Sequence, residues 1–317
     1  MKKTNLKIGV SSCLLGNEVR YDGKHKQMRY ITDILSNYFI LIPVCPEVEI
    51  GMTVPREPVW LIDNPKSPQM VSVKTNKNWT NVMLSFSIKK IKEPDYKDLS
   101  GFILKNKSPS CGMEKVEVST SSNKIKKSGV GLFAGELMKK YPLLPVIEEK
   151  KLNYLHLREN FICEIFSYAR IQKLFKNNFS KNKAIEFHFN HKYLMQAHSP
   201  KHYTLLKKLV IKINNMKPAD FRNEYKRLFM EGLKYQTTIK KHSVVLKRII
   251  NLLKKQITTS EREYLLRIID DYQNGITPVQ IPITLLKYFV EKHDIQNLKN
   301  QLYLNPHPEE TLLRYTV

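Results

Sequence analysis

The chain has 317 residues, of which 42% are hydrophobic and only 11 are glycine. This composition excludes a disordered chain and leaves room for one large or two ordinary domains. No run of about 18 consecutive apolar residues occurs, so we expect no membrane span, and the polar N-terminal residues lack the apolar segment of a signal peptide. We therefore expect a cytoplasmic protein, in which four cysteines are more typical of metal ligands or reactive thiols than of disulfides.

The formal net charge of +24 is unevenly distributed along the chain. Residues 1–150 contain 24 Lys and Arg against 15 Asp and Glu, whereas residues 151–317 contain 29 against 14. Between residues 188 and 260 there are 16 basic and only 3 acidic residues. Such a block favours a polyanionic partner, because each phosphate that it neutralises releases condensed counterions. The alternative is a solvated helical face without a partner.

Apolar runs alternate with helical periodicity in the first half of the chain. The expected strands lie at residues 6–13 (with the loop that follows), 39–44, 101–104 and 143–147, and the expected helices at 28–38, 79–91, 131–141 and 155–175. Residues 59–62 and 70–73 are typical of a small hairpin. This alternation predicts an α/β domain with a mainly parallel sheet and helices on both faces.

The second half shows helical patterns and no strand pattern. We expect helices at residues 183–197, 201–213, 218–232, 237–257 and 283–293. A further helix is expected to start with a capping box formed by Ser260 and Glu263 and to end at Asn274 and Gly275. The polar residues 177–182 are the expected boundary. We therefore predict an α/β domain at 1–176, followed by an all-α basic domain at 177–317.

Three cysteines occupy equivalent places in the predicted α/β domain. Cys13, Cys45 and Cys111 each lie in a loop after an apolar strand, and loops from the carboxyl ends of neighbouring parallel strands meet in one crevice. Three thiolates with an open fourth position hold zinc or a 4Fe-4S cluster. Because they lie 32 and 66 residues apart, no short ligand spacing supports them, and the alternative is three unrelated packed cysteines. Cys163 falls on the buried face of the 155–175 helix and is expected to be packed.

Several segments resemble the thiouracil desulfidase family called TudS, and they keep that family's order and spacing from about residue 6 to 172. The segments are Ser11-Ser12-Cys13-Leu14-Leu15-Gly16 with Val19-Arg20-Tyr21-Asp22-Gly23, Val44-Cys45-Pro46-Glu47 with Pro55-Arg56, Ser108-Pro109-Ser110-Cys111-Gly112, and Arg158-Glu159-Asn160-Phe161. The resemblance implies a 4Fe-4S cluster held by Cys13, Cys45 and Cys111, with one iron left open for a thiocarbonyl sulfur. The implied reaction is a non-redox hydrolysis in which the metal is the Lewis acid.

Such a hydrolysis needs groups that move protons and groups that hold the substrate. Glu47, which follows a cysteine ligand closely, is the expected general base or acid. Ser108 is the first choice for a hydrogen bond to the base or to the attacking water, and Ser110 is the second. The candidate substrate contacts are Ser12, Arg20, Asp22 and Arg56. For the last three of these, the alternative is a local ion pair that holds the loops.

The run from Phe187 to Ser199 resembles the hallmark of the helical domain that follows TudS in fused bacterial proteins. Fusions of this type, called RudS, are implicated in removing sulfur from 4-thiouridine in tRNA, so the resemblance implies tRNA as the partner. The candidate tRNA contacts are His188, His191, Lys192, His198, Lys201, Lys207, Lys208, Arg222, Lys226 and Arg227. Five histidines between residues 188 and 242 leave a metal site or a structural hydrogen-bonding role as alternatives.

The first functional hypothesis is therefore a 4Fe-4S-dependent desulfidase that converts 4-thiouridine in tRNA to uridine and releases sulfide. A second is a desulfidase for free thiolated nucleobases such as thiouracil, against which the basic second domain argues. A third is a non-catalytic nucleic-acid-binding protein whose thiols hold zinc or sense oxidants. The sequence leaves protein partners undetermined.

Overall fold

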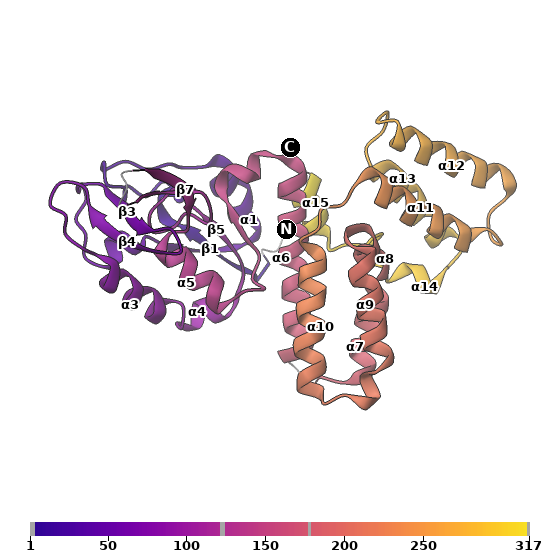
Figure 1. Cartoon of the computed structure of the whole chain (residues 1–317). Helices are drawn as coiled ribbons and strands as arrows, with labels where there is room; N and C mark the ends of the chain where they lie inside the picture. The colour runs from indigo at the N-terminus through magenta and orange to yellow at the C-terminus, as the bar shows by residue number, and fades with distance from the viewer. Residues whose placement is uncertain (1–3, 121–123, 177–178, 316–317) are drawn as a thin grey trace. The chain divides into compact units, whose positions relative to one another are not determined.

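The computed structural model describes residues 4–120, 124–176 and 179–315. The chain divides into two compact units, Met1–Phe161 and Ile162–Val317. This division falls within helix α6 (Leu155–Lys176), whereas the sequence places the boundary at the end of that helix. Figure 1 shows the first unit, in indigo to magenta, with strands and helices, and the second with helices.

The first unit contains a four-stranded parallel sheet with the order β2-β1-β5-β8. Its strands are β1 (Lys7–Ser11), β2 (Ile40–Val44), β5 (Leu99–Leu104) and β8 (Val146–Glu148). They confirm the predicted parallel sheet. Strands β1 and β5 approach closely at Gly9, where a Cβ atom would lie 2.2 Å from the ring of Phe102. Glycine therefore lets that ring fill the core between these strands.

A second four-stranded sheet, with the order β4-β3-β6-β7, was not predicted. The hairpin of β3 (Val59–Asn64) and β4 (Ser67–Ser72) is confirmed, but β6 (Val116–Ser119) pairs parallel to β3 and antiparallel to β7 (Ile125–Gly129). The pairing in this sheet is mixed. Four of the five residues of β7 are exposed, so its sequence lacks the apolar alternation that marks a strand.

Short helices connect these strands. In place of the helix predicted at 28–38 there is a π-helical turn, η2 (Tyr30–Leu35), followed by α1 (Ser36–Tyr38). The remaining helices are η1 (Ser12–Leu15), α2 (Pro46–Glu49), α3 (Thr80–Lys90), α4 (Pro94–Lys97), α5 (Leu132–Lys140) and η3 (Glu149–Asn153). The rings of Tyr96, Phe102 and Phe133 pack with centroids 6.0–6.4 Å apart and join α4 and α5 to the parallel sheet.

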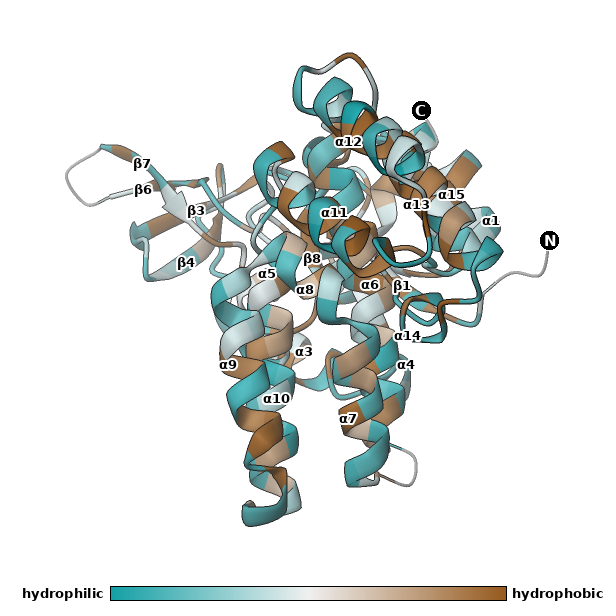
Figure 2. Cartoon of the chain, turned by 90° about the vertical axis from the view of Figure 1, so that its right-hand side faces the viewer, coloured by the Kyte–Doolittle hydropathy of each residue, from teal (hydrophilic) through white to brown (hydrophobic). Residues whose placement is uncertain are grey.

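The described residues of the second unit form helices and no strands. After α6 these are α7 (Lys181–Asn190), α8 (Lys192–His198), α9 (Pro200–Ile211), η4 (Ile213–Asn215), α10 (Pro218–Leu233), α11 (Ile239–Leu253), α12 (Thr259–Gln273), α13 (Gln280–Lys292), α14 (Gln296–Lys299) and α15 (Pro308–Tyr315). In Figure 2 helices such as α9, α10 and α11 carry both hydrophobic and hydrophilic residues. This pattern lets each bury one face.

Two predicted helix details of the second unit are wrong. The helix expected at 183–197 is interrupted at His191, which ends α7 and precedes α8. The capping box of α12 uses Thr258 and Glu261 in place of Ser260 and Glu263. Both pairs have the spacing of a capping box, so the sequence pattern does not distinguish them. The hydroxyl of Thr258 accepts the backbone N–H of Glu261, and the helix begins two residues earlier than predicted. Across the described residues, every helix is too short or too polar to cross a bilayer.

Candidate active site at the carboxyl ends of three strands

Three cysteines follow three neighbouring strands of the parallel sheet. Cys13 lies in η1 directly after β1, Cys45 directly follows β2, and Cys111 lies in the loop after β5. Because β2, β1 and β5 are adjacent and parallel, their carboxyl ends share one edge. The predicted placement of the three cysteine loops at one sheet edge is confirmed. Their role as ligands stays a prediction.

The three thiols are close enough to affect one another electrostatically. Burial raises the pKa of Cys13 to about 11, and the negative charge of a Cys45 thiolate raises it further. Burial also raises the pKa of Cys111, with smaller contributions from Cys45 and Cys13 in the same direction. Burial and the carboxylate of Glu47 raise the pKa of Cys45. Without a bound cation the thiols therefore stay protonated at neutral pH, and metal binding would release their protons.

Glu47 is placed by two hydrogen-bonding partners from different loops. Arg56 donates to its Oε2 atom from Nη2 at 2.5 Å and from Nε at 3.2 Å, and this ion pair is largely buried. Ser110 donates to its Oε1 atom at 2.7 Å. The guanidinium of Arg56 also donates to the carbonyl of Val19 at 3.1 Å. Arg56 therefore ties Glu47 to the loop after β1, which favours the local ion pair over a substrate contact.

The two serines of the cysteine loop have different positions. Ser110 Oγ lies 2.7 Å from Glu47 and 3.7 Å from the Sγ atom of Cys111. Ser108 Oγ lies 3.0 Å from Ser110 Oγ and accepts the backbone N–H of Cys111 at 3.1 Å. Ser110 is therefore the serine that contacts Glu47 directly, whereas the sequence favoured Ser108, which contacts Ser110.

The other predicted substrate residues make local contacts. Arg20 Nη2 lies 3.3 Å from Asp22 Oδ2, which is the ion pair considered as their alternative role. Ser12 is buried, and its Oγ atom accepts from Asn17 Nδ2 at 2.7 Å. These contacts shape the loop after β1 and favour a role in holding that loop.

Two acidic residues missed by sequence analysis fix the loop after β5. Both oxygens of Glu149 are occupied, Oε1 by Lys105 Nζ at 2.6 Å and Oε2 by the N–H of Asn106 at 2.7 Å. Glu148 Oε1 accepts the N–H of Met113 at 3.0 Å. Both carboxylates are buried. Two adjacent acidic residues at the end of the last predicted strand could have indicated this role, because a buried carboxylate needs hydrogen-bonding or charged partners.

Three thiolates can hold either a zinc ion or a 4Fe-4S cluster. Among the described residues, no three His, Cys, Asp or Glu side chains come close enough to hold one metal ion. Tetrahedral zinc would need its thiolates around one centre at about 2.3 Å. In a cubane each thiolate binds its own iron, so the sulfurs stand further apart. Ligation of a cluster by Cys13, Cys45 and Cys111 stays a prediction.

Two of the three histidines predicted to contact tRNA are buried. His191 is 2% exposed and His198 is 1% exposed. His198 Nδ1 donates to the Tyr235 carbonyl at 2.9 Å, and its Nε2 atom lies 3.7 Å from the thiol of Cys163. His191 and His198 therefore do not lie on an exposed face, as the prediction assumed, because helical spacing does not tell a buried face from an exposed one. Cys163 is buried, as expected.

His188 and the predicted cations divide into two groups. His188 is half-buried and stacks on Tyr203. Lys226 donates to Gln172 at 2.9 Å, and Arg227 is paired with Glu224 and Glu231 at 2.7 and 2.8 Å. Within the residues that the structure describes, the exposed or half-exposed predicted cations without a carboxylate partner are Lys192, Lys201, Lys207, Lys208 and Arg222.

Each compact unit matches a known family. Residues 8–149 match the family described as 2-thiouracil desulfurase, and residues 192–308 match a protein of unknown function, DUF1722. The uncharacterized protein YbbK of Bacillus subtilis (strain 168) is 32% identical over 151 residues, which are 46% of this chain and 97% of that protein. The uncharacterized protein YbgA of Escherichia coli (strain K12) is 22% identical over 166 residues, 52% of this chain and 98% of that protein. The solved structure of the 4Fe-4S-dependent thiouracil desulfidase TudS is 24% identical, with 47% of this chain and 94% of that chain covered at a TM-score of 0.38.

Proposed function

The chain belongs to the 2-thiouracil desulfurase family through its first unit, and we propose that it is a desulfidase that converts 4-thiouridine in tRNA to uridine. The carbon–sulfur double bond is replaced by a carbon–oxygen double bond from water, and the sulfur leaves as hydrogen sulfide. No electrons are gained or lost, so no oxidant or reductant is needed. The observation that carries this proposal is the meeting of three cysteine loops with the Glu47–Ser110 pair at one sheet edge.

Cys13, Cys45 and Cys111 would hold a 4Fe-4S cluster. When bound, such a cluster supplies a thiophilic Lewis acid with one open coordination position. The chain's own contribution is a partly enclosed position for the substrate base. Cys13 and Cys111 are buried and Cys45 is half-buried, so substrate would reach this edge from the side of Cys45.

Glu47 is the residue proposed to take the proton of the attacking water. Its Oε1 atom already accepts the hydroxyl of Ser110, so a proton can pass from Ser110 Oγ to Glu47 Oε1 while the hydroxyl oxygen takes another from water. Arg56 holds Oε2 and fixes the carboxylate plane. General acid–base catalysis of this kind contributes about 10²–10⁴-fold to a rate.

The second unit provides a cationic surface suited to a phosphate backbone. Lys192 of α8, Lys207 of α9 and Arg248 of α11 are close enough that, after burial, the charges of Arg248 and Lys207 lower the pKa of Lys192. Beside them, His188 and Tyr203 stack in parallel with ring centroids 5.6 Å apart. Cations next to aromatic rings are typical of RNA contacts.

Phosphate contacts would also serve catalysis on a folded RNA. A thiolated base in tRNA is stacked, and drawing it out costs a few kcal/mol. Binding energy from the helical unit can offset this cost. A free thiouracil needs no unstacking and gains nothing from the second unit, which favours tRNA over the free base as substrate.

The test is turnover by protein purified without oxygen. Incubation with tRNA that contains 4-thiouridine should yield uridine and sulfide, measured by nucleoside chromatography and sulfide assay, and the protein should contain iron and acid-labile sulfide. Faster turnover of free thiouracil than of tRNA would instead identify a free-base desulfidase. Stoichiometric zinc without iron would contradict both.

A further inference from the structure

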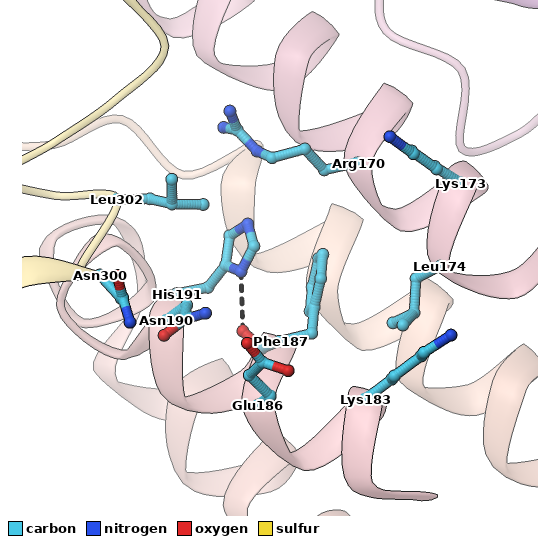
Figure 3. Close-up of a pocket in the computed structure, with 10 residues that line it drawn as sticks. All are labelled: Arg170, Lys173, Leu174, Lys183, Glu186, Phe187, Asn190, His191, Asn300 and Leu302. Carbon is cyan, nitrogen blue, oxygen red and sulfur yellow. Dashed lines mark hydrogen bonds between the residues drawn. The ribbon is translucent and has the colours of Figure 1, made fainter. Parts of the chain in front are cut away.

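A cavity of about 490 Å³ lies within the second unit, away from the cysteine loops in sequence. It is lined by the C-terminal half of α6, by α7 and by the segment that follows α14, as Figure 3 shows. Backbone and side-chain hydrogen bonds hold that segment on α7, from Leu302 N–H to the Asn190 carbonyl at 2.9 Å and from Gln301 Nε2 to the Phe189 carbonyl at 2.8 Å. The cavity is therefore built from elements that are tied together, and its volume is in the range of small-molecule sites.

In the part of the chain that the structure describes, two buried polar atoms on the lining side chains have no hydrogen-bond partner. One is Nε2 of His191, a residue 2% exposed, and the other is Nε of Arg170. His191 Nδ1 lies 2.7 Å from the Phe187 carbonyl, so it must carry the proton and leave Nε2 as an acceptor. Figure 3 shows Nε2 on the side of the ring away from that carbonyl, toward Arg170 and Leu302. Leaving such atoms buried and unpaired is unfavourable, and a ligand that pairs with them would remove that cost.

The two atoms have complementary requirements. His191 Nε2 needs an N–H or O–H donor, and Arg170 Nε needs an acceptor. Arg170 is held in place by Glu310, at 2.8 Å from its Nη1 atom. A ligand with adjacent hydroxyl groups satisfies both atoms, because each hydroxyl donates and accepts.

The rest of the lining adds apolar walls and a cationic rim. Phe187 stacks on the His191 ring with centroids 3.8 Å apart and, with Leu174 and Leu302, presents an apolar surface. Lys173 and Lys183 are exposed lining residues, opposed by one acid, Glu186. The rim therefore favours an anionic group beside a planar or apolar body.

We propose that this cavity binds one nucleoside monophosphate unit, either as a free nucleotide or as the 5′-phosphorylated end of an RNA. The ribose hydroxyls would meet His191 Nε2 and Arg170 Nε, the base would lie against Phe187, and the phosphate would meet Lys173 and Lys183. The proposal does not depend on desulfidase activity, because its readout is binding.

The experiment is calorimetric titration of the full chain with uridine 5′-monophosphate and with uridine. Saturable binding of the monophosphate is expected, with uridine at least about tenfold weaker, which corresponds to about 1.4 kcal/mol for the phosphate contacts. His191→Phe and the double variant Lys173→Gln/Lys183→Gln should each weaken binding about tenfold. The double variant Lys139→Gln/Lys140→Gln, which removes the same charge from exposed positions of α5, should bind as the unmodified chain does.

Competition separates the two sources of the ligand. Displacement of the mononucleotide by a 5′-phosphorylated RNA trimer supports an RNA end, and no displacement supports a free nucleotide. If His191→Phe does not fold, the exposed lysine variant still decides, since both of its positions are on the surface. No saturable binding of uridine 5′-monophosphate overturns the proposal, and so does binding that the lysine variant leaves unchanged.

Discussion

Charged groups in the candidate active site are paired across loops, whereas the helical unit also brings three cations, Lys192, Lys207 and Arg248, near one another. Glu47 is held by Arg56, 9 residues away, and by Ser110, 63 residues away, and Glu149 is held by Lys105, 44 residues away in the chain. In the helical unit Lys207 lies close enough to Lys192 for its charge to lower the pKa of Lys192. Pairing fixes geometry for chemistry, and unpaired cations are available for a polyanion. This difference is the basis of the proposed division of catalysis and RNA binding between the two units.

The largest expected effect on activity comes from substitution of Cys111, and it tests the division between the units. Cys111→Ala should abolish conversion of 4-thiouridine while tRNA binding, measured by filter retention, stays within about twofold. The reason is that the residue lies with the other two cysteines and contributes nothing to the cationic surface. Cys163→Ala is the matched control, because this thiol is equally buried but lies in the second unit, and it should retain activity.

Retained activity in Cys111→Ala would contradict the proposed cluster site. Loss of both activity and tRNA binding would contradict the division between the units. The iron content of the purified variant separates a lost cluster from a damaged fold.

The next effect sharpens the roles within the first unit. Glu47→Gln should lower kcat by about 10²–10⁴ while iron content and tRNA affinity are retained, because the amide cannot take a proton from water. Ser110→Ala should cost about tenfold, the value of one hydrogen bond in the transition state. Ser108→Ala should cost less, since this serine contacts Glu47 only through Ser110. Single-turnover rates check the order, and a larger loss for Ser108→Ala would disprove it.

Particular residues show which parts of this site could be predicted from the sequence. The three cysteine loops were predictable because each follows an apolar strand, and parallel neighbours bring their carboxyl ends together. The contact of Ser110 with Glu47 was not, because it depends on the local turn of two loops 63 residues apart. Strand β7 was missed because its side chains are solvated. Burial of His191 and His198 was missed because helical spacing shows which residues share a face of the helix. It does not show whether another helix packs on that face.

A smaller effect is expected in the stability of the helical unit. Burial lowers the pKa of His198 to about 4, with Arg314 and Lys241 acting in the same direction and the hydrogen bond to Tyr235 opposing. The folded state keeps this histidine neutral while the unfolded state binds a proton below pH 6.5. His198 alone should therefore lower the free energy of unfolding by about 3 kcal/mol as the pH drops from 6.5 to 4.

Urea unfolding at pH 7 and pH 4.5 measures this loss. His198→Gln keeps an amide donor for the Tyr235 carbonyl but does not titrate, so its stability should change less between the two pH values. His25→Gln is the control, because His25 is exposed, and it should leave the pH dependence unchanged. Equal pH dependence in all three chains would contradict a buried neutral His198.

The smallest effect is expected from a variant of the helical unit, which should change tRNA binding and leave the chemistry of the first unit unchanged. Lys192→Gln/Lys207→Gln/Arg248→Gln should raise KM for tRNA about tenfold at moderate salt and leave kcat unchanged. It should also reduce the salt dependence of tRNA affinity, since fewer counterions are released on binding. With free thiouracil the same variant should show the kinetics of the unmodified chain, because that substrate offers no phosphate. A fall in turnover of free thiouracil would mean that these cations support the active site itself, and catalysis and RNA binding would then share one surface.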